Sequence, residues 1–200
     1  SGSPLSQAPV PDSTNPGSFS YYVSQTINGC ESLRAEVQVE VNVVPVISIT
    51  GDDTICTGDS TTLTAAGAAS YMWSPGGQTG STISVSPTSN TTYTVTGTDV
   101  SGCSEDAIIT INVDPTPIAS LSGPASICSG EDALFTVTGS PNATVVYSIN
   151  SGANQTVVLD GAGLATITEI NPLVDPEMSL VSVNNSDCTA SVADSITITV

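Results

Sequence analysis

Residues 55–59 read Ile-Cys-Thr-Gly-Asp, and residues 127–131 read Ile-Cys-Ser-Gly-Glu, which places the second copy of this opening phrase 127 − 55 = 72 positions after the first. A closing phrase, in which a polar turn runs into a cysteine, occurs three times, at 28–30, 101–103 and 186–188. An alternating apolar run follows each closing phrase and ends near 41, 113 and 200. A repeat of this length predicts tandem small domains, which usually serve as spacers or fibres.

The apolar residues between these phrases alternate with polar ones, which is the period of a β-strand. Clusters of Gly, Pro, Asn and Asp interrupt them about every 8–12 residues, and no segment shows a helical period. Six or seven short antiparallel strands in each complete repeat are typical of a Greek-key sandwich. We therefore predict an all-β chain of tandem Greek-key β-sandwiches, the first of which is incomplete.

Proline marks the expected module boundaries, at Pro45 and at Pro115 and Pro117. The first module (1–46) has a closing phrase without an opening one, whereas the second (47–114) and third (115–200) have both. Strands are expected near 19–27 and 34–44; near 47–50, 60–66, 70–74, 82–86, 91–98 and 107–113; and near 118–122, 133–138, 144–150, 155–159, 165–170, 178–183 and 194–200. Because proline fixes φ and favours an extended path, we expect the linkers to be stiff and the chain to form a semi-rigid rod.

The charge balance excludes several functions. The chain has 19 Asp and Glu, no His, and a single cation, Arg34, so its formal net charge is −18. Nucleic acid and anionic membranes are excluded as partners, because binding them requires basic residues. Without histidine a Ser-His-Asp triad cannot form, and no other catalytic constellation is present, so we expect no enzyme. No apolar run has the length needed to span a membrane, so membrane insertion is not expected.

Four cysteines occupy matching positions in the two complete modules. Cys56 and Cys128 follow the first strand, while Cys103 and Cys188 precede the last one. If the end of the first strand lies beside the start of the last, the expected bonds are Cys56–Cys103 and Cys128–Cys188, each worth about 4 kcal/mol in the chain-entropy model. A zinc site with four cysteine ligands is the alternative, although close cysteine pairs are missing and an acidic chain of secreted type favours disulfides.

Cys30 is the unpaired fifth cysteine, because the opening phrase that should supply its partner is missing from the first module. One explanation is that the chain begins inside a domain and the partner lies upstream. The other is that a neighbouring molecule completes the first module by strand addition, which would make the chain a polymerising subunit. The sequence leaves both explanations open.

Two stretches resemble a known family, and the third module resembles it more weakly. Residues 21–32, Tyr-Tyr-Val-Ser-Gln-Thr-Ile-Asn-Gly-Cys-Glu-Ser, resemble the end of the Ig-like repeats of giant cell-surface adhesins of gliding bacteria. Residues 56–113, with Ser-Tyr-Met-Trp-Ser-Pro-Gly-Gly at 70–77 and Thr-Tyr-Thr-Val-Thr-Gly-Thr at 92–98, resemble the PKD-like repeats of the same proteins. The third module shares the opening and closing phrases but lacks the Tyr-x-Trp strand.

The resemblance implies an incomplete Ig-like domain, a PKD-like sandwich and an Ig-like sandwich, exported by the type IX route to the cell surface. It does not fix a ligand, because such repeats occur both in motility adhesins and as accessories of secreted enzymes. It also brings a loose O-glycosylation sequon, Asp-Ser/Thr-apolar, whose candidate sites are Ser13, Thr54, Ser60 and Ser195.

Two further groups of residues are candidate sites. Tyr71 and Trp73 fall on one face of a strand and could stack on a sugar, but a lone Trp on a central strand is more often part of the sandwich core. Six carboxylates flank the expected Cys56–Cys103 bond and could hold Ca²⁺, the one cofactor considered, although they lack EF-hand spacing. They are Asp52, Asp53, Asp59, Asp99, Glu105 and Asp106.

We therefore expect a non-catalytic stalk or fibre segment of an extracellular repeat adhesin, which presents a binding region away from the cell surface. Its expected partners are neighbouring repeats of the same long chain or fibre. One alternative is a fibre subunit that polymerises by completing its partial first domain in trans. The other is a set of carbohydrate-binding modules attached to a secreted enzyme, with a surface polysaccharide as ligand and Tyr21 or Tyr71 as contacts.

Overall fold

The computed structural model describes residue 10 and residues 12–200, and this part of the chain consists of strands and loops without a helix. It therefore contains no helical segment that is long and apolar enough to cross a bilayer. The chain divides into two compact units: 1–50 with 64–83 and 93–109, and 51–63 with 84–92 and 110–200. The all-β fold expected from the period-two pattern is confirmed.

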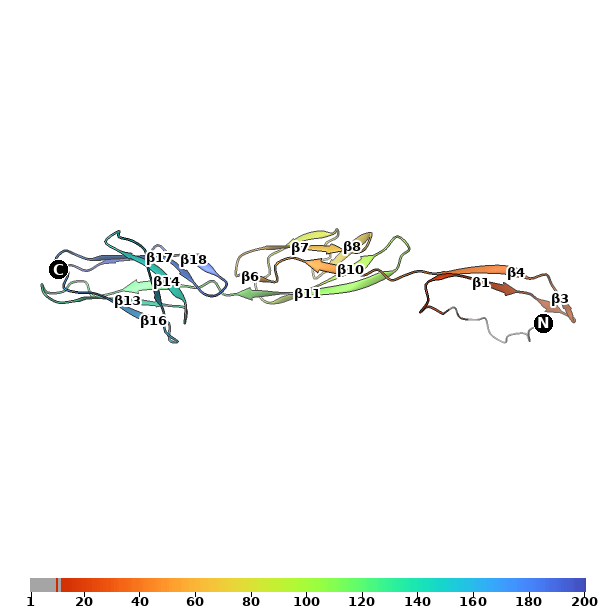
Figure 1. Ribbon diagram of the computed structural model, residues 1–200, viewed down its shortest axis with the longest axis horizontal. Coiled ribbons are helices and arrows are strands. Elements are labelled where there is room, and N and C mark those ends of the chain that lie inside the picture. The colour runs from red at the N-terminus through yellow and green to blue at the C-terminus, as the bar shows by residue number, and fades with distance from the viewer. Residues whose placement is uncertain (1–9, 11) are drawn as a thin grey trace. The chain divides into compact units, whose positions relative to one another are not determined.

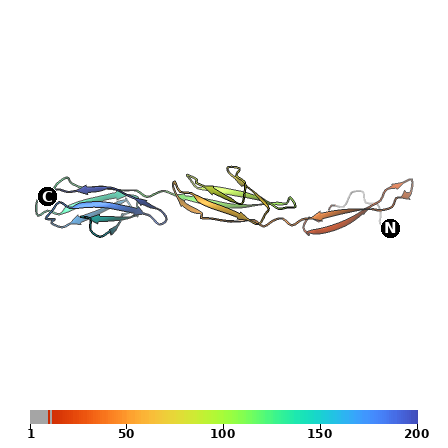
Figure 2. The same cartoon turned by 90° about the horizontal axis from the view of Figure 1, so that it is seen from above.

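A two-stranded ribbon forms the first part of the described chain. In it β1 (Gly17–Val23) pairs antiparallel with β4 (Ala35–Val41), and the two run side by side in both views (Figure 1 and Figure 2). Between them, β2 (Thr26–Ile27) and β3 (Cys30–Glu31) form a short hairpin around Asn28 and Gly29, whose φ angles are 51° and 80°. Two positive φ angles match the tight turn that fits the right-handed twist of a hairpin.

Two sheets follow between residues 48 and 114. One has the order β5-β7-β9 and the other the order β6-β11-β10-β8. The strands are β5 (Ser48–Thr50), β6 (Thr54–Cys56), β7 (Thr61–Ala66), β8 (Ser70–Ser74), β9 (Thr82–Val85), β10 (Thr91–Thr98) and β11 (Ser104–Asp114). Buried side chains alternate along them, as in β7, where Thr61, Leu63 and Ala65 are buried.

The last part of the chain repeats this arrangement. One sheet has the order β12-β13-β16, and in the other β15, β14 and β17 lie in sequence with β18 and β19 both paired to β17. The strands are β12 (Ala119–Ser122), β13 (Ala133–Gly139), β14 (Thr144–Ile149), β15 (Gln155–Val158), β16 (Leu164–Glu169), β17 (Glu177–Asn184), β18 (Thr189–Ser191) and β19 (Ser195–Thr197). Two sheets with their apolar faces inward form a β-sandwich.

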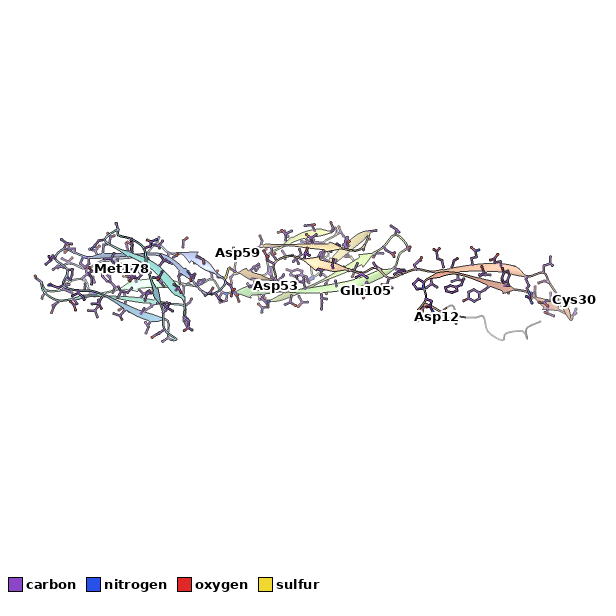
Figure 3. The ribbon with its side chains drawn as sticks, in the orientation of Figure 1. Asp12, Cys30, Asp53, Asp59, Glu105 and Met178 are labelled. Carbon is purple, nitrogen blue, oxygen red and sulfur yellow. A yellow bond between two sulfur atoms is a disulfide. The ribbon has the colours of Figure 1, made fainter. Side chains whose placement is uncertain are left out.

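The cores consist of the inward-facing residues that the alternation predicts. In the 48–114 part, Leu63, Trp73, Val95 and Ile111 have no exposed surface. In the 119–200 part a single cluster joins both sheets, and its fully buried members include Phe135, Val137, Val145, Ile198 and Met178, the last of which is labelled in Figure 3. Burial of an apolar side chain of this size contributes roughly 1.5–3 kcal/mol, so these residues supply most of the driving force for folding.

The first strand of each sandwich is broken and changes sheets. Residues 48–50 pair antiparallel with β7, but after Gly51 the chain turns and β6 runs parallel to the end of β11, with Cys56 opposite Asp114. A Cβ at Gly51 would meet the Thr62 carbonyl oxygen at 2.5 Å, and its φ of 148° also favours glycine. The second sandwich repeats the device, because Ser126 pairs parallel with Thr199. The strand at 54–56 is not among those expected from the sequence, and its pairing decides where Cys56 lies.

Candidate functional site: a disulfide beside the proline linker

One disulfide joins Cys56 to Cys188, with a Cα–Cα distance of 5.7 Å and a sequence separation of 132 residues. Both cysteines belong to the same compact unit. Cys56 is the last residue of β6 and is half-buried, whereas Cys188 directly precedes β18 and is 1% exposed. The bond therefore connects a residue of the second sequence module with a residue of the third, across the linker 115–117.

The position of Cys56 follows from the parallel pairing of β6 with β11. The amide of Thr57 donates to the Asp114 carbonyl at 2.8 Å, which fixes the chain beside the end of β11. A turn follows at Gly58, with a φ of 97°, and the amide of Asp59 donates back to the Cys56 carbonyl at 2.9 Å. This turn leaves Cys56 at the rim of the sheet, next to the point where the chain enters the linker.

The position of Cys188 follows from the loop between β17 and β18. The Asn185 amide donates to the Cys188 carbonyl at 3.0 Å, and the Cys188 amide donates to Asn185 Oδ1 at 2.7 Å. The loop closes onto an antiparallel pair, Asn184 with Thr189. Cys188 is therefore held at the end of the sandwich where β17 terminates.

The linker itself is bonded on both sides. Thr116 Oγ1 donates to the Thr57 carbonyl at 3.1 Å, and Asn185 Nδ2 donates to the Pro115 carbonyl at 3.4 Å. The side chain of Pro117 is fully buried. Proline stiffness, two side-chain hydrogen bonds and one covalent bond thus act on the same short segment, which is the opposite of a flexible hinge.

The expected bond between Cys56 and Cys103 is wrong. Cys56 lies opposite Asp114, at the end of β11, whereas Cys103 directly precedes Ser104, at its start. Eleven residues of extended strand separate the two positions, which is about 36 Å at about 3.3 Å per residue. A disulfide needs Cα atoms about 4.4–6.8 Å apart, so these two cysteines cannot meet.

The expected bond between Cys128 and Cys188 is wrong for the same reason. Cys128 lies near the start of β17. The amide of Ile127, the residue before it, donates to the Thr199 carbonyl at 2.9 Å, and Thr197 pairs with Glu177, the first residue of β17. Cys188 lies beyond the other end of β17, a strand of 8 residues, or about 26 Å. Cys30, Cys103 and Cys128 carry free thiols. Among the described residues no three His, Cys, Asp or Glu side chains are grouped to hold a metal, so the four-cysteine zinc alternative is not formed either.

The six carboxylates proposed for calcium do not form one cluster. Asp53 lies beside the end of β11, where its carbonyl accepts from the Asn112 amide at 2.8 Å, and Asp59 follows the Cys56 turn. Glu105 lies near the start of the same strand, seven residues before Asn112. Figure 3 shows Asp53 and Asp59 near β6 and Glu105 further along β11. The strand separates Asp52, Asp53 and Asp59 from Asp99, Glu105 and Asp106, so the premise of a shared site fails.

Acidic residues do surround the disulfide. Cys56 borders an open depression of about 480 Å³ whose lining includes Asp52, Asp59 and Asp187. Negative charge lowers the local concentration of anionic reductants, and attack on a disulfide requires a thiolate. This setting, together with the burial of Cys188, protects the bond chemically.

The two aromatic residues of β8 have different surroundings. Trp73 is 0% exposed and donates its Nε1 hydrogen to the Gly80 carbonyl at 3.0 Å. Tyr71 is half-buried, and its hydroxyl accepts from the Ala68 amide at 2.8 Å and donates to the Ala68 carbonyl at 3.0 Å. The core interpretation of Trp73 is confirmed, and Tyr71 has both of its hydroxyl functions occupied.

The glycosylation candidates all have exposed side chains, and modification there stays a prediction. They are Ser13, Thr54, Ser60 and Ser195. Ser13 lies in a turn built by Asp12, whose Oδ1 accepts from the Thr14 amide at 2.9 Å and from the Thr14 hydroxyl at 2.6 Å. These bonds, with a third from Asn15, hold the pKa of the Asp12 carboxyl below its ordinary value of 3.8.

Comparisons with known proteins add little. No family model matches the chain, and no curated protein matches it. A structure from a 1.5-MDa bacterial ice-binding adhesin shares 15% identity over 92% of this chain and 74% of that one, with a TM-score of 0.38. The human OSCAR ligand-binding domain shares 13% identity over 79% of this chain and 98% of that one, with a TM-score of 0.36.

A third structure, Salmonella alpha-2-macroglobulin, shares 10% identity over 90% of this chain and 19% of that one, with a TM-score of 0.31. Scores this low support no conclusion about ancestry or function. The fold assignment rests on the strands and sheets of the chain itself.

Proposed function

We propose that this chain is a non-catalytic structural segment of an extracellular repeat adhesin or surface fibre, which holds a binding region away from the cell. The observation that carries the proposal is the Cys56–Cys188 disulfide across a proline linker that is itself hydrogen-bonded on both sides. Such a linker resists bending between consecutive sequence modules, and a stiff connection is what a stalk requires.

The disulfide also changes how the chain carries tension. A pull on the two ends reaches Cys56, crosses the sulfur–sulfur bond and continues from Cys188, so residues 57–187 are not stretched. Most of both complete sandwiches lies inside this shielded loop. A segment that stays folded under load suits a stalk better than it suits a ligand-binding module.

Composition supports an exposed, inert role. A net charge of −18 keeps neighbouring chains apart, and a chain with one Arg and no Lys offers trypsin-like proteases a single cleavage site. Disulfides persist in oxidising compartments, which favours an extracellular location. The narrower assignment, to a gliding bacterium and the type IX route, is part of the proposal and rests on the sequence resemblance at 21–32 and 56–113.

Single-molecule stretching of residues 1–200 between terminal handles tests this function. Under oxidising conditions we expect the loop of 132 residues to remain hidden, and after reduction we expect up to about 460 Å of additional contour length, at about 3.5 Å per residue. The variant Cys128→Ser should behave like the parent chain, because Cys128 is not in the bond. Equal extension before and after reduction would show that the segment is not mechanically shielded.

A second candidate function, a subunit that polymerises by strand addition, is favoured by the exposed β1–β4 ribbon. Its two strands pair with each other, and within the described part of the chain neither pairs with any other strand. One face carries Phe19, Tyr21, Val37 and Val39, in the cross-strand pairs Phe19–Val39 and Tyr21–Val37, and Val37 is 47% exposed. Electron microscopy of the purified chain distinguishes the two functions, since filaments would indicate a subunit and single particles a stalk segment.

A further inference from the structure

Both halves of the Cys56–Cys188 bond occur again in the chain with the same local structure. Cys128 repeats the opening half. In each case the amide three residues later donates to the cysteine carbonyl, at 2.9 Å for Cys56 and 3.0 Å for Cys128. The glycine of the turn has a φ of 97° at Gly58 and 94° at Gly130. The two opening turns are therefore equivalent in conformation as well as in sequence.

The two opening cysteines also occupy equivalent places on their sandwiches. Cys56 lies opposite Asp114, the last residue of β11, just before the chain leaves the second module. Cys128 follows Ile127, whose amide donates to the carbonyl of Thr199, next to the end of the third module. Each opening cysteine thus lies at the exit of its module, where the following module would begin.

Cys103 repeats the closing half. Its amide donates to Asp99 Oδ1 at 2.9 Å and its carbonyl accepts from the Asp99 amide at 2.9 Å. Cys188 makes the same two bonds with Asn185, at 2.7 and 3.0 Å. Cys30 also follows a tight turn, paired with Ile27 in the β2–β3 hairpin. All three closing cysteines come directly after a turn and before the last apolar run of their module.

Two of the closing cysteines, Cys188 and Cys103, lie at the entrance of their modules. For Cys188 the link is the bond from Asn185 to the Pro115 carbonyl in the linker. Cys103 is placed there by Gly97, which belongs to the same compact unit. Gly97 packs against Ile47, at the start of the second module, so closely that an added Cβ would collide with the Ile47 side chain. A linker joins the exit of one module to the entrance of the next. It therefore brings the opening cysteine of one module near the closing cysteine of the next.

We propose that the opening cysteine of each module forms a disulfide with the closing cysteine of the following module, and that Cys56–Cys188 is one step of such a ladder. By this rule Cys128 bonds to the closing cysteine of a following module, and Cys103 to the opening cysteine of the preceding one. Cys30 is the closing cysteine of the first module, so by the same rule it bonds to the opening cysteine of a module that precedes that one. The proposal rests on the geometry of the cysteines and does not require the stalk function.

The accessibility of the three thiols fits this role. Cys30 and Cys128 are exposed and Cys103 is half-buried, so another module can reach each of them. Each bond forms when two thiols lose two protons and two electrons to a disulfide oxidant, which is reduced to two thiols. Because Cys128 lies between Cys56 and Cys188 in the sequence, successive steps close overlapping loops and leave no linker of the array without a cross-link.

The decisive experiment extends the chain by one module. Residues 1–200 are followed by Asp and a second copy of 115–200, which reproduces the junction at Asp114. After oxidation in a glutathione redox buffer, digestion at acidic residues without reduction gives the disulfide map. We expect Cys128 to be bonded to the appended copy of Cys188, and the original Cys56–Cys188 bond reports that the chain has folded. Cys128 left free, or bonded within its own module, while Cys56–Cys188 is intact would overturn the proposal.

A matched variant and a second measurement complete the test. Replacing the appended copy of Cys188 by Ser should leave Cys128 free without changing Cys56–Cys188. Independently, oxidation of concentrated 1–200 should give covalent dimers that join Cys128 to Cys30 or Cys103 and lose that linkage in Cys128→Ser. Dimers joined mainly as Cys128–Cys128 would contradict the pairing rule. The stretching result depends on Cys56–Cys188 alone, so failure of the ladder and failure of the stalk function are distinguishable.

Discussion

Replacement of Cys56 by Ser should destabilise the third module, and the structure gives the size of the effect. Cys56 is fixed beside Asp114, so when residues 115–200 unfold from an otherwise folded chain, the disulfide closes a loop from Asp114 to Cys188 of 188 − 114 = 74 residues. The chain-entropy relation gives about 4.4 kcal/mol for a loop of this length at 25 °C. Cys56 is half-buried, so the substitution itself leaves little cavity.

Urea unfolding followed by far-UV circular dichroism measures this loss. With an m-value of about 1–3 kcal/mol/M, the midpoint of the transition assigned to 115–200 should fall by about 1.5–4.4 M in Cys56→Ser. The matched controls are Cys103→Ser and Cys128→Ser, which remove free thiols and should change the free energy of unfolding by less than about 0.5 kcal/mol.

Two results would refute this reasoning. A loss below about 1 kcal/mol in Cys56→Ser would mean that the cross-link does not constrain the unfolded third module. A loss in Cys103→Ser as large as that in Cys56→Ser would indicate a bond within the second module, contrary to the parallel pairing of β6 with β11.

Three further predictions concern other parts of the chain. Trp73→Ala should cost about 3–5 kcal/mol, measured by urea unfolding, because it empties a fully buried core position; a loss below about 1 kcal/mol would contradict that role. Gly29→Ala should weaken the β2–β3 hairpin by about 1 kcal/mol, seen as faster local hydrogen exchange, since the φ of 80° disfavours alanine; unchanged exchange would argue against the turn. The Asp12 carboxyl, whose pKa is lowered mainly by the Thr14 hydroxyl, should keep its turn above the ordinary value of 3.8 and release it only as the pH falls through the lowered pKa; a Thr14 amide resonance that titrates above 3.8 would contradict this.

Several elements could be predicted from the sequence because they depend on local patterns. Alternation placed Tyr71 and Trp73 on one face of a strand, and the buried position of Trp73 follows from that face being apolar. The Asn28-Gly29 turn and the proline linker can likewise be predicted, because they depend on residues with intrinsic φ preferences. These features need no knowledge of which strands are neighbours.

The disulfide could not be predicted in this way. Thr54–Cys56 is too short a strand to show a period, so the change of sheets at Gly51 left no readable signal beyond the glycine itself. Without this change of sheets, the sequence pattern places Cys56 beside the start of the last strand, whereas in the structure Cys56 lies beside its end. The two isolated apolar runs at 47–50 and 54–56, interrupted by Gly-Asp-Asp, are the one clue that the first strand is divided.

The amino-acid sequence by itself determined the repeat, the all-β architecture and which positions face the cores, because alternation and turn residues act over a few neighbours in the chain. Only the tertiary structure decided which cysteines meet. That choice depends on whether the first and last strands run parallel or antiparallel, and the direction of pairing between segments 58 residues apart, from Cys56 to Asp114, is set by the packing of whole sheets.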